Sequence, residues 1–449
     1  MINREKLERE LAVEIETYRD THKKSKELFE RAGKSLLLGH SHNWQNMWPG
    51  SFPIYIEEAK GCTVKDVDGN EYFDICLGDT GAMTGHSPKS VETIGESLKR
   101  GNTFMLPTED HVWVAEELTR RFGLTHWQFA ISASDANRFA IRWARFATGR
   151  KKILVFNHCY HGTVDETLAQ LYDGVVGPKE GNLGWGIDPK ETTKVVEFND
   201  IEAVREALKD RDVALVLAEP ALTNISIVPP LPGFLEELRE ATRETGTLLL
   251  IDETHTISEG VGGYTRKYKF EPDMLVVGKP IGSGIPVAVY GFTTELAEAI
   301  KAKYPDPSEE DALGIGTTLT GSAVAARAIK ATLQQVLTED AYNHMHEMAD
   351  RYAEGVQSVI DEYELPWRVV KMGSRIEYLF NQDCPVNGTD VYESFHDFEL
   401  HTYIHLAMSN RGILITPFHN MALMCPDTKP EQVDMHTEMF RQVIGAVVD

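Results

Sequence analysis

Two charged residues stand where apolar runs of the sequence end. Lys279 closes the run Asp273-Met-Leu-Val-Val-Gly, and Asp252 closes the earlier run Leu248-Leu-Leu-Ile. A parallel strand buried on both faces is a continuous apolar run, and α/β enzymes place their chemistry at the carboxyl ends of such strands. An amine and a carboxylate there suit pyridoxal 5'-phosphate, because the lysine can form a Schiff base and the carboxylate can keep the pyridine nitrogen protonated. Two strands that merely end in charged residues would look the same.

The sequence around this pair alternates between helical patterns and apolar strands from about residue 110. Helices are predicted over 110–122, 135–148 and 233–245. Strands are predicted over 127–132, 153–156, 213–218, 247–252, 274–278 and 287–293. This alternation predicts an α/β fold built on a large, mostly parallel, doubly wound sheet.

The two ends of the chain have a different texture. Residues 5–32 have the apolar spacing of one amphipathic helix, and the turn Asp66-Val-Asp-Gly-Asn70 separates two short strand-like runs. After about residue 320 a helical stretch reaches about residue 360. We therefore expect an N-terminal helix and small β unit over 1–75, a large cofactor-binding domain over 76–320 and a small domain over 321–449.

Composition narrows the class of protein. The net charge of −24 argues against nucleic acid or an anionic membrane as a partner, because both need a basic face. The five cysteines are scattered without CxxC spacing, so neither a disulfide framework nor a zinc site is indicated. The N-terminal residues are charged and lack the apolar core of a signal peptide, and no apolar run is long enough to span a bilayer. We expect a cytoplasmic enzyme without a metal.

Further polar residues follow the predicted strands and should converge at the same edge of the sheet. Ser132-Ala133-Ser134-Asp135 opens a helix directly after a strand and could cradle a phosphate, although an ordinary serine N-cap has the same sequence. Tyr160 could stack on a pyridine ring or simply fill a cleft. Glu219 ends another strand. No glycine pattern completes GxGxxG after a strand, which disfavours a dinucleotide.

Several motifs occur in a fixed order along nearly the whole chain. They are Asp66-Val-Asp-Gly-Asn-Glu-Tyr-Phe-Asp74, Thr84-Gly-His-Ser-Pro88, Ser132-Ala-Ser-Asp-Ala-Asn137, Tyr160-His-Gly162, Glu219-Pro220, Asp252-Glu253, Gly278-Lys279 and Gly316-Thr-Thr-Leu-Thr-Gly321. This ordered set resembles the class III aminotransferases, which are pyridoxal phosphate enzymes of fold type I, and is most similar to their glutamate-1-semialdehyde aminomutase branch. The resemblance implies a small α+β domain made from both ends of the chain.

The resemblance also implies roles for individual residues. Lys279 would carry the Schiff base and move a proton, and Asp252 would pair with the pyridinium nitrogen. Ala133 and Ser134 would hold the phosphate, and Tyr160 would stack on the ring. Thr318 would reach the phosphate of the neighbouring subunit, which implies a homodimer with active sites at its interface. Thr254 stands where the family commonly has valine, which would put a hydroxyl under the cofactor.

The substrate is the open question. The segment from His42 to Trp48 lacks the arginine by which the aminomutase grips a carboxylate, and its Trp44, Met47 and Trp48 suit an apolar or aromatic amine. Arg375 is the alternative carboxylate clamp, since its fork binds carboxylates bidentately, although it could equally pair with Glu377 along a strand.

Three functions are compatible with these residues. The first is a transaminase that exchanges an amino group between an amine or amino acid and a 2-oxo acid. The second is an aminomutase or racemase, which needs no second substrate. The third is a non-catalytic binding protein that keeps the fold, against which Lys279 and Asp252 argue.

Overall fold

The computed structural model describes residues 1–304, 314–394 and 397–449. The chain forms two compact units. Unit 1 consists of Met1–Pro88, Asp340–Cys384 and Glu393–Asp449, and unit 2 consists of Lys89–Glu339 and Pro385–Tyr392. The first change of unit falls later than residue 75 because the following segment pairs back onto unit 1, where Gly61 bridges His86. The second falls later than residue 320 because α11 (Ala323–Gln335) packs against α3 (Lys89–Ser97) in unit 2.

The large sheet of unit 2 has seven strands in the order β4-β12-β11-β10-β9-β5-β8. These strands are β4 (His126–Ala130), β5 (Lys152–Phe156), β8 (Thr193–Val196), β9 (Val213–Ala218), β10 (Leu248–Asp252), β11 (Met274–Val277) and β12 (Ala288–Phe292). Strands β8, β5, β9, β10 and β11 are parallel, whereas β12 is antiparallel to both β11 and β4. The α/β fold with its mostly parallel sheet is confirmed. Strand β8 was not predicted, because two of its four residues are polar.

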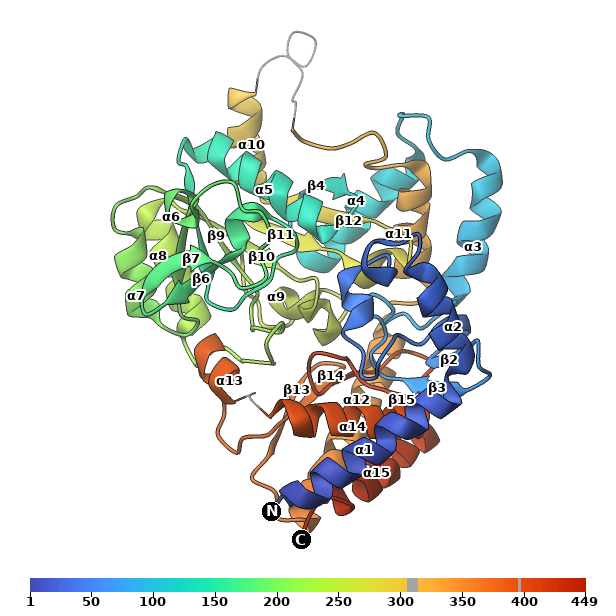
Figure 1. Ribbon diagram of the computed structural model, residues 1–449. Helices are drawn as coiled ribbons and strands as arrows, with labels where there is room; N and C mark the ends of the chain where they lie inside the picture. The colour runs from blue at the N-terminus through green and yellow to red at the C-terminus, as the bar shows by residue number, and fades with distance from the viewer. Residues whose placement is uncertain (305–313, 395–396) are drawn as a thin grey trace. The chain divides into compact units, whose positions relative to one another are not determined.

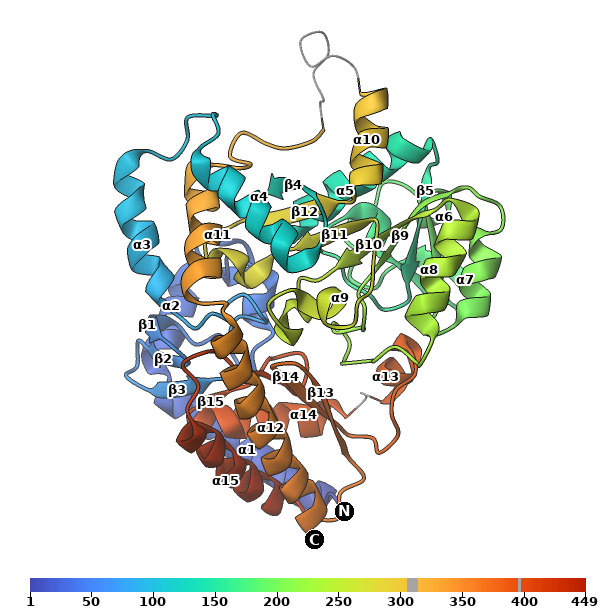
Figure 2. The same cartoon turned by 180° about the vertical axis from the view of Figure 1, so that it is seen from behind.

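Helices cover both faces of this sheet. In unit 2 they are α3, α4 (Glu109–Phe122), α5 (Ala133–Thr148), α6 (Pro189–Thr192), α7 (Ile201–Leu208), α8 (Phe234–Thr245), α9 (Gly263–Lys267), α10 (Thr294–Lys303) and α11. Helix α5 lies in front of the strands in Figure 1, and α4 and α8 lie in front of them in Figure 2. A small hairpin, β6 (Ala169–Tyr172) and β7 (Val175–Pro178), stands beside α6.

Strands β10 and β11 are neighbours in the middle of the sheet, and this pairing positions the chemistry. Asp252, the last residue of β10, lies opposite Val276 of β11. Lys279 follows β11 after the single residue Gly278. The carboxyl ends of the two strands therefore bring the carboxylate and the amine to one edge of the sheet, as the sequence predicts.

Unit 1 joins both ends of the chain. Its helices are α1 (Arg4–Thr21), α2 (Lys23–Ala32), α12 (Glu339–Glu362), α14 (Phe398–Asn410) and α15 (Pro430–Gly445), and α13 (Gly388–Ser394) crosses from one unit to the other. One sheet has the order β1 (Ile56–Lys60), β2 (Thr63–Asp66), β3 (Glu71–Asp74) and β15 (Ile413–Leu414), and a second contains β13 (Arg368–Met372), β14 (Arg375–Leu379) and β16 (Met421–Leu423). The termini lie side by side (Figures 1 and 2), since the Asn3 N–H donates to the Val447 carbonyl at 2.7 Å.

The helices differ from the sequence expectation at two places. The helix predicted over 5–32 breaks at His22, whose buried ring contacts the Tyr18 carbonyl through Nδ1 at 2.8 Å and the Tyr72 hydroxyl through Nε2 at 2.7 Å. These contacts hold His22 at a non-helical φ of −123°. The helix predicted after residue 320 is likewise divided into α11 and α12. Within the described ranges, no helix has both the length and the apolar character that a bilayer crossing requires.

Candidate active site

The carboxylate at the end of β10 is buried, and both of its oxygens have polar contacts. Asp252 Oδ2 accepts a hydrogen bond from Asn137 Nδ2 at 2.8 Å and lies 3.0 Å from His161 Nδ1, and Oδ1 accepts one from the Thr254 N–H at 3.1 Å. Burial acts to raise the pKa of Asp252, but the hydrogen bond and positive charge of His161 outweigh it, so the pKa lies below its ordinary value of 3.8. Asp252 is therefore an anion at neutral pH.

His161 is the partner that the sequence did not reveal. Its side chain is completely buried, and burial acts to lower its pKa. The neighbouring Cys159 and the Asp252 carboxylate outweigh this effect and raise the pKa of His161 to about 10. At neutral pH the imidazolium and the carboxylate thus form an internal ion pair. The position of His161 next to Tyr160, in a loop that follows a strand, predicts that the ring lies near the edge of the sheet. The sequence does not predict which carboxylate the ring contacts.

Lys279 occupies a strained backbone position. Its φ is +49°, in the left-handed region that residues other than glycine rarely adopt, and it begins the short helix η6 (Lys279–Gly282). Its Nζ is hydrogen-bonded to Nε2 of His255, which lies in the loop after β10. The preceding Gly278 has no room for a side chain, because a Cβ there would lie 2.9 Å from the Ala133 Cβ. Strain of this kind concentrates where the surrounding structure fixes a functional group.

The N-terminus of α5 (Ala133–Thr148) is the turn in which the sequence analysis predicts a phosphate site. Ser132 caps the helix, its hydroxyl accepting from the Asp135 N–H at 3.2 Å. Ser134 Oγ accepts from the Thr163 N–H at 3.1 Å, and a Cβ on Gly162 would lie 2.0 Å from that oxygen. Ala133, the first residue of the helix, has a negative φ, so its replacement of glycine costs no backbone strain. The turn is thus shaped by close backbone approach, as in phosphate-binding loops.

Glu219 directly follows β9, and Tyr160 lies in the loop after β5. Glu219 Oε1 accepts a hydrogen bond from Asn224 Nδ2 at 3.1 Å, and the same amide donates to the Tyr160 carbonyl at 3.3 Å. Burial raises the pKa of Glu219. Asn224 thereby fixes the backbone of the loop that carries Tyr160, and the stacking role of the Tyr160 ring stays a prediction.

These residues fit pyridoxal phosphate in charge and in shape. A buried anion is available for a protonated ring nitrogen, a lysine amine for a covalent bond and a helix N-terminus for a phosphate. Ala133 and Ser134 adjoin Gly278 and Gly162, respectively, so the N-terminal turn of α5 lies beside the lysine. Asn137 Oδ1, which is buried, finds no hydrogen-bond donor among the residues that the structure describes. This unused acceptor is consistent with a site that binds a polar group.

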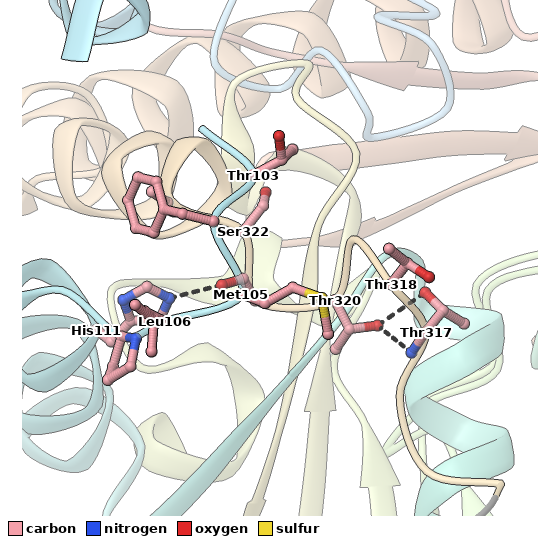
Figure 3. A pocket seen from close by; sticks show the side chains of 12 residues that line it. Thr103, Met105, Leu106, His111, Thr317, Thr318, Thr320 and Ser322 are labelled. Carbon is pink, nitrogen blue, oxygen red and sulfur yellow. Dashed lines mark hydrogen bonds between the residues drawn. The ribbon is translucent and has the colours of Figure 1, made fainter. Parts of the chain in front are cut away.

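Thr318 lies at a different place in unit 2, on a cavity of about 280 Å³ (Figure 3). The cavity is lined by residues 103–107, 111, 317, 318 and 320–323. The loop is held by the Thr320 hydroxyl, which accepts from the Thr317 N–H at 2.9 Å, and by His111 Nε2, which contacts the Gly321 carbonyl at 2.7 Å. Thr318 is exposed, and its contact with a neighbouring subunit's phosphate stays a prediction.

The three residues proposed for the substrate belong to unit 1. The Trp44 ring is 5.7 Å from the Phe418 ring, and Trp48 packs against the cluster of Val64, Tyr72 and Leu414. Arg375 is completely buried, and its guanidinium donates to Thr80 Oγ1 at 2.5 Å and to Asp79 Oδ1 at 3.4 Å. A carboxylate partner is therefore already present, which favours a structural role for Arg375. Its role as a substrate clamp remains a prediction.

Comparisons with known proteins extend over nearly the whole chain. The profile of the family described as Aminotransferase class-III matches residues 45–444. A Halalkalibacterium halodurans protein named glutamate-1-semialdehyde 2,1-aminomutase 2 is 33% identical over 443 residues, which cover 94% of this chain and 98% of that protein. A crystal structure of a glutamate-1-semialdehyde-aminomutase from Pseudomonas aeruginosa PAO1 has a TM-score of 0.97 and 42% identity, with 100% of both chains covered. A second structure of that enzyme is a complex with PMP. An omega-transaminase from Sphaerobacter thermophilus has a TM-score of 0.84 and 26% identity, covering 94% of this chain and 97% of that one.

Proposed function

Because the chain belongs to the class III aminotransferase family, and is thus a pyridoxal phosphate-dependent enzyme of fold type I, we propose that it is an aminomutase that moves an amino group within one substrate of the glutamate 1-semialdehyde type. The observation that carries the proposal is the similarity, over nearly the full length, to proteins that bear the aminomutase name. The sequence placed a transaminase first and the aminomutase second, and the comparisons favour the second. The non-catalytic alternative is disfavoured by the enzyme family itself.

Each residue at the sheet edge has a role in this proposal. When bound, the cofactor withdraws electrons from the substrate carbon that loses a proton. Asp252 holds the positive charge of the pyridine nitrogen, and His161 and Asn137 fix the carboxylate in its ionised, correctly turned form. Lys279 would hold the cofactor covalently and, once that bond has passed to the substrate, would carry a proton between the two carbons bonded to the transferred nitrogen. The turn at Ser134 anchors the phosphate.

The test is incubation of the purified enzyme with glutamate 1-semialdehyde and no second substrate. Moving the amino group by one carbon converts this 4-amino-5-oxopentanoate into 5-amino-4-oxopentanoate, which chromatography separates from the substrate. We expect product in the absence of any 2-oxo acid and none with Lys279→Ala, which serves as the matched control. Conversion that appears only when a 2-oxo acid and a separate amine are supplied would overturn the aminomutase.

A transaminase is the second candidate, and it has its own supporting observation. The segment from His42 to Trp48 contains no arginine, and Trp44 faces the Phe418 ring, so this part of unit 1 presents aromatic rather than cationic groups. An apolar wall discriminates by about 1–3 kcal/mol per methylene-sized difference, so a broad range of amines is expected. A screen of amines with pyruvate or 2-oxoglutarate as acceptor tests this candidate in the same preparation.

We also propose that the active form is a cytoplasmic homodimer. Support for the dimer comes from the cavity at Thr318, whose lining includes Met105 and Leu106 with 81% and 68% of their surfaces exposed. Exposed apolar side chains beside a loop of hydroxyls are typical of a surface that a second subunit covers. Lys279→Ala and Thr318→Ala, each inactive alone, should regain part of their activity after subunit exchange, since one mixed site has both residues intact. A fully active monomer at high dilution would contradict the dimer.

The five free cysteines support the cytoplasmic location.

A further inference from the structure

His255 is a buried titratable residue that has no part in the roles described so far. It lies three positions after Asp252, in the loop that follows β10, and only 6% of its surface is exposed. Its Nε2 is hydrogen-bonded to Lys279 Nζ. Both residues belong to unit 2, and the parallel pairing of β10 with β11 brings their segments together. The contact therefore involves the one amine on which the chemistry depends.

The chemistry of the two groups sets the direction of the hydrogen bond. An alkylammonium holds its proton more tightly than an imidazolium by about four pKa units, so a proton shared between the two resides on Nζ. An imidazole with its proton on Nδ1 has a lone pair on Nε2 and accepts from an ammonium. Hydrogen bonds with one charged partner are about twice as strong as neutral ones. His255 is thus placed to stabilise Lys279 in its protonated form.

This preference matters because the lysine changes charge during the reaction. To remove a proton from carbon, the Lys279 amine must first be neutral, and it becomes an ammonium as the proton arrives. The hydrogen bond from Nζ to the neutral imidazole becomes stronger as positive charge develops on Nζ. This extra stabilisation lowers the barrier for the proton transfer.

We propose that His255 is a further catalytic residue, which accepts a hydrogen bond from the Lys279 ammonium and stabilises the proton while it resides on Nζ. One proton leaves a carbon bonded to the transferred nitrogen, stays on Nζ and is delivered to the other carbon bonded to that nitrogen, so the imidazole neither gains nor loses a proton overall. The assignment of a carbon acid as substrate rests on the proposed function, whereas the pairing of the two side chains does not.

The test measures the reactivity of the Lys279 amine in the full chain loaded with PMP. PMP has no aldehyde, so it forms no covalent bond with the lysine. Trace acetylation at about pH 8, followed by peptide mass spectrometry, gives the labelling rate of Lys279 relative to Lys99, whose side chain is 73% exposed. His255→Leu removes the acceptor, and His255→Gln is the matched control, because its amide oxygen can still accept.

We expect His255→Leu to raise the relative labelling of Lys279 by about tenfold to a hundredfold, since loss of a hydrogen bond to a charged group favours the neutral amine by that factor. His255→Gln should stay near the wild-type value. Equal labelling in all three proteins, or an equal rise in both variants, would overturn the proposal. In the cofactor-loaded enzyme, His255→Leu should also slow proton removal by about tenfold or more, with His255→Gln restoring part of the rate.

The two proposals fail separately. If the chain does not take up PMP, as judged by absorbance after gel filtration, then the proposed function is wrong whatever the labelling shows. If PMP binds and glutamate 1-semialdehyde is converted, but Lys279 labelling is independent of His255, then the function stands and the role of His255 is withdrawn.

Discussion

Removing one partner of the Asp252–His161 pair should cost more stability than removing both. Their side chains are 6% and 0% exposed, and His161 Nδ1 lies 3.0 Å from Asp252 Oδ2. Loss of one member of a buried ion pair leaves an uncompensated charge, which costs about 3–5 kcal/mol, whereas replacement of both members costs much less. Asp252→Asn and His161→Gln preserve size and hydrogen-bonding capacity, so each variant mainly removes charge.

The assay is a double-mutant cycle on urea unfolding, with all four proteins at one concentration and without added cofactor, which would stabilise each protein by a different amount. We expect a coupling of about 2 kcal/mol or more between the two positions. Single losses that add to within about 0.5 kcal/mol would refute the ion pair, because independent sites behave additively.

The same pair predicts how the coupling changes with pH. The pKa of His161 is raised to about 10, so its contribution is complete below the unfolded value of about 6.5 and is lost as the pH rises through about 10. The lowered pKa of Asp252 makes its contribution complete above the unfolded value and lost under acid conditions. The stability difference between wild type and His161→Gln should therefore be largest near pH 5–6 and decline toward pH 10. A difference that grows with pH would contradict the assignment.

Three further outcomes are expected. Borohydride reduction of the cofactor-loaded enzyme should label Lys279, as judged by peptide mass, and labelling of another lysine would refute the assignment. The Lys279→Ala variant should keep its fold and lose turnover. Gly162→Ala should destabilise the protein by about 2–4 kcal/mol and weaken cofactor binding, because the new Cβ meets Ser134 Oγ at 2.0 Å at a φ of +83°. If Arg375 clamps the substrate, Arg375→Ala should raise the KM for a 2-oxo acid. If Arg375 only pairs with buried Asp79, the same variant should lose about 3–5 kcal/mol of stability with KM unchanged. Unfolding and kinetic measurements together decide between the two roles.

The strands that carry the site could be predicted because a strand buried on both faces is a continuous apolar run in the sequence. The runs that end at Asp252 and near Lys279 are continuous and apolar, and their parallel pairing follows from the strand–helix alternation. The reversed direction of β12 could not be predicted from such a run, since an antiparallel central strand is equally apolar.

The partners of the catalytic groups could not be predicted for a different reason. His161 and His255 lie in loops, and the direction of a loop side chain depends on which backbone it packs against. The sequence shows that His255 is near Asp252, but not that its ring turns to Lys279. Arg375 was similarly ambiguous, because its partner Asp79 lies almost 300 residues away in the chain.

The composition of unit 1 has a consequence for the order in which the protein can fold during synthesis. Unit 2 is almost one continuous stretch and can form its seven-stranded sheet once residue 292 has emerged from the ribosome. The three antiparallel strands β1, β2 and β3 are synthesised earlier, but their sheet gains its fourth strand only with Ile413–Leu414. At about 5–20 residues per second, the exposed edge of β3 waits on the order of tens of seconds for that partner. Until then the open strand can pair with other chains. Slow translation between residues 300 and 410 should therefore lower the soluble yield more than an equal delay after residue 414.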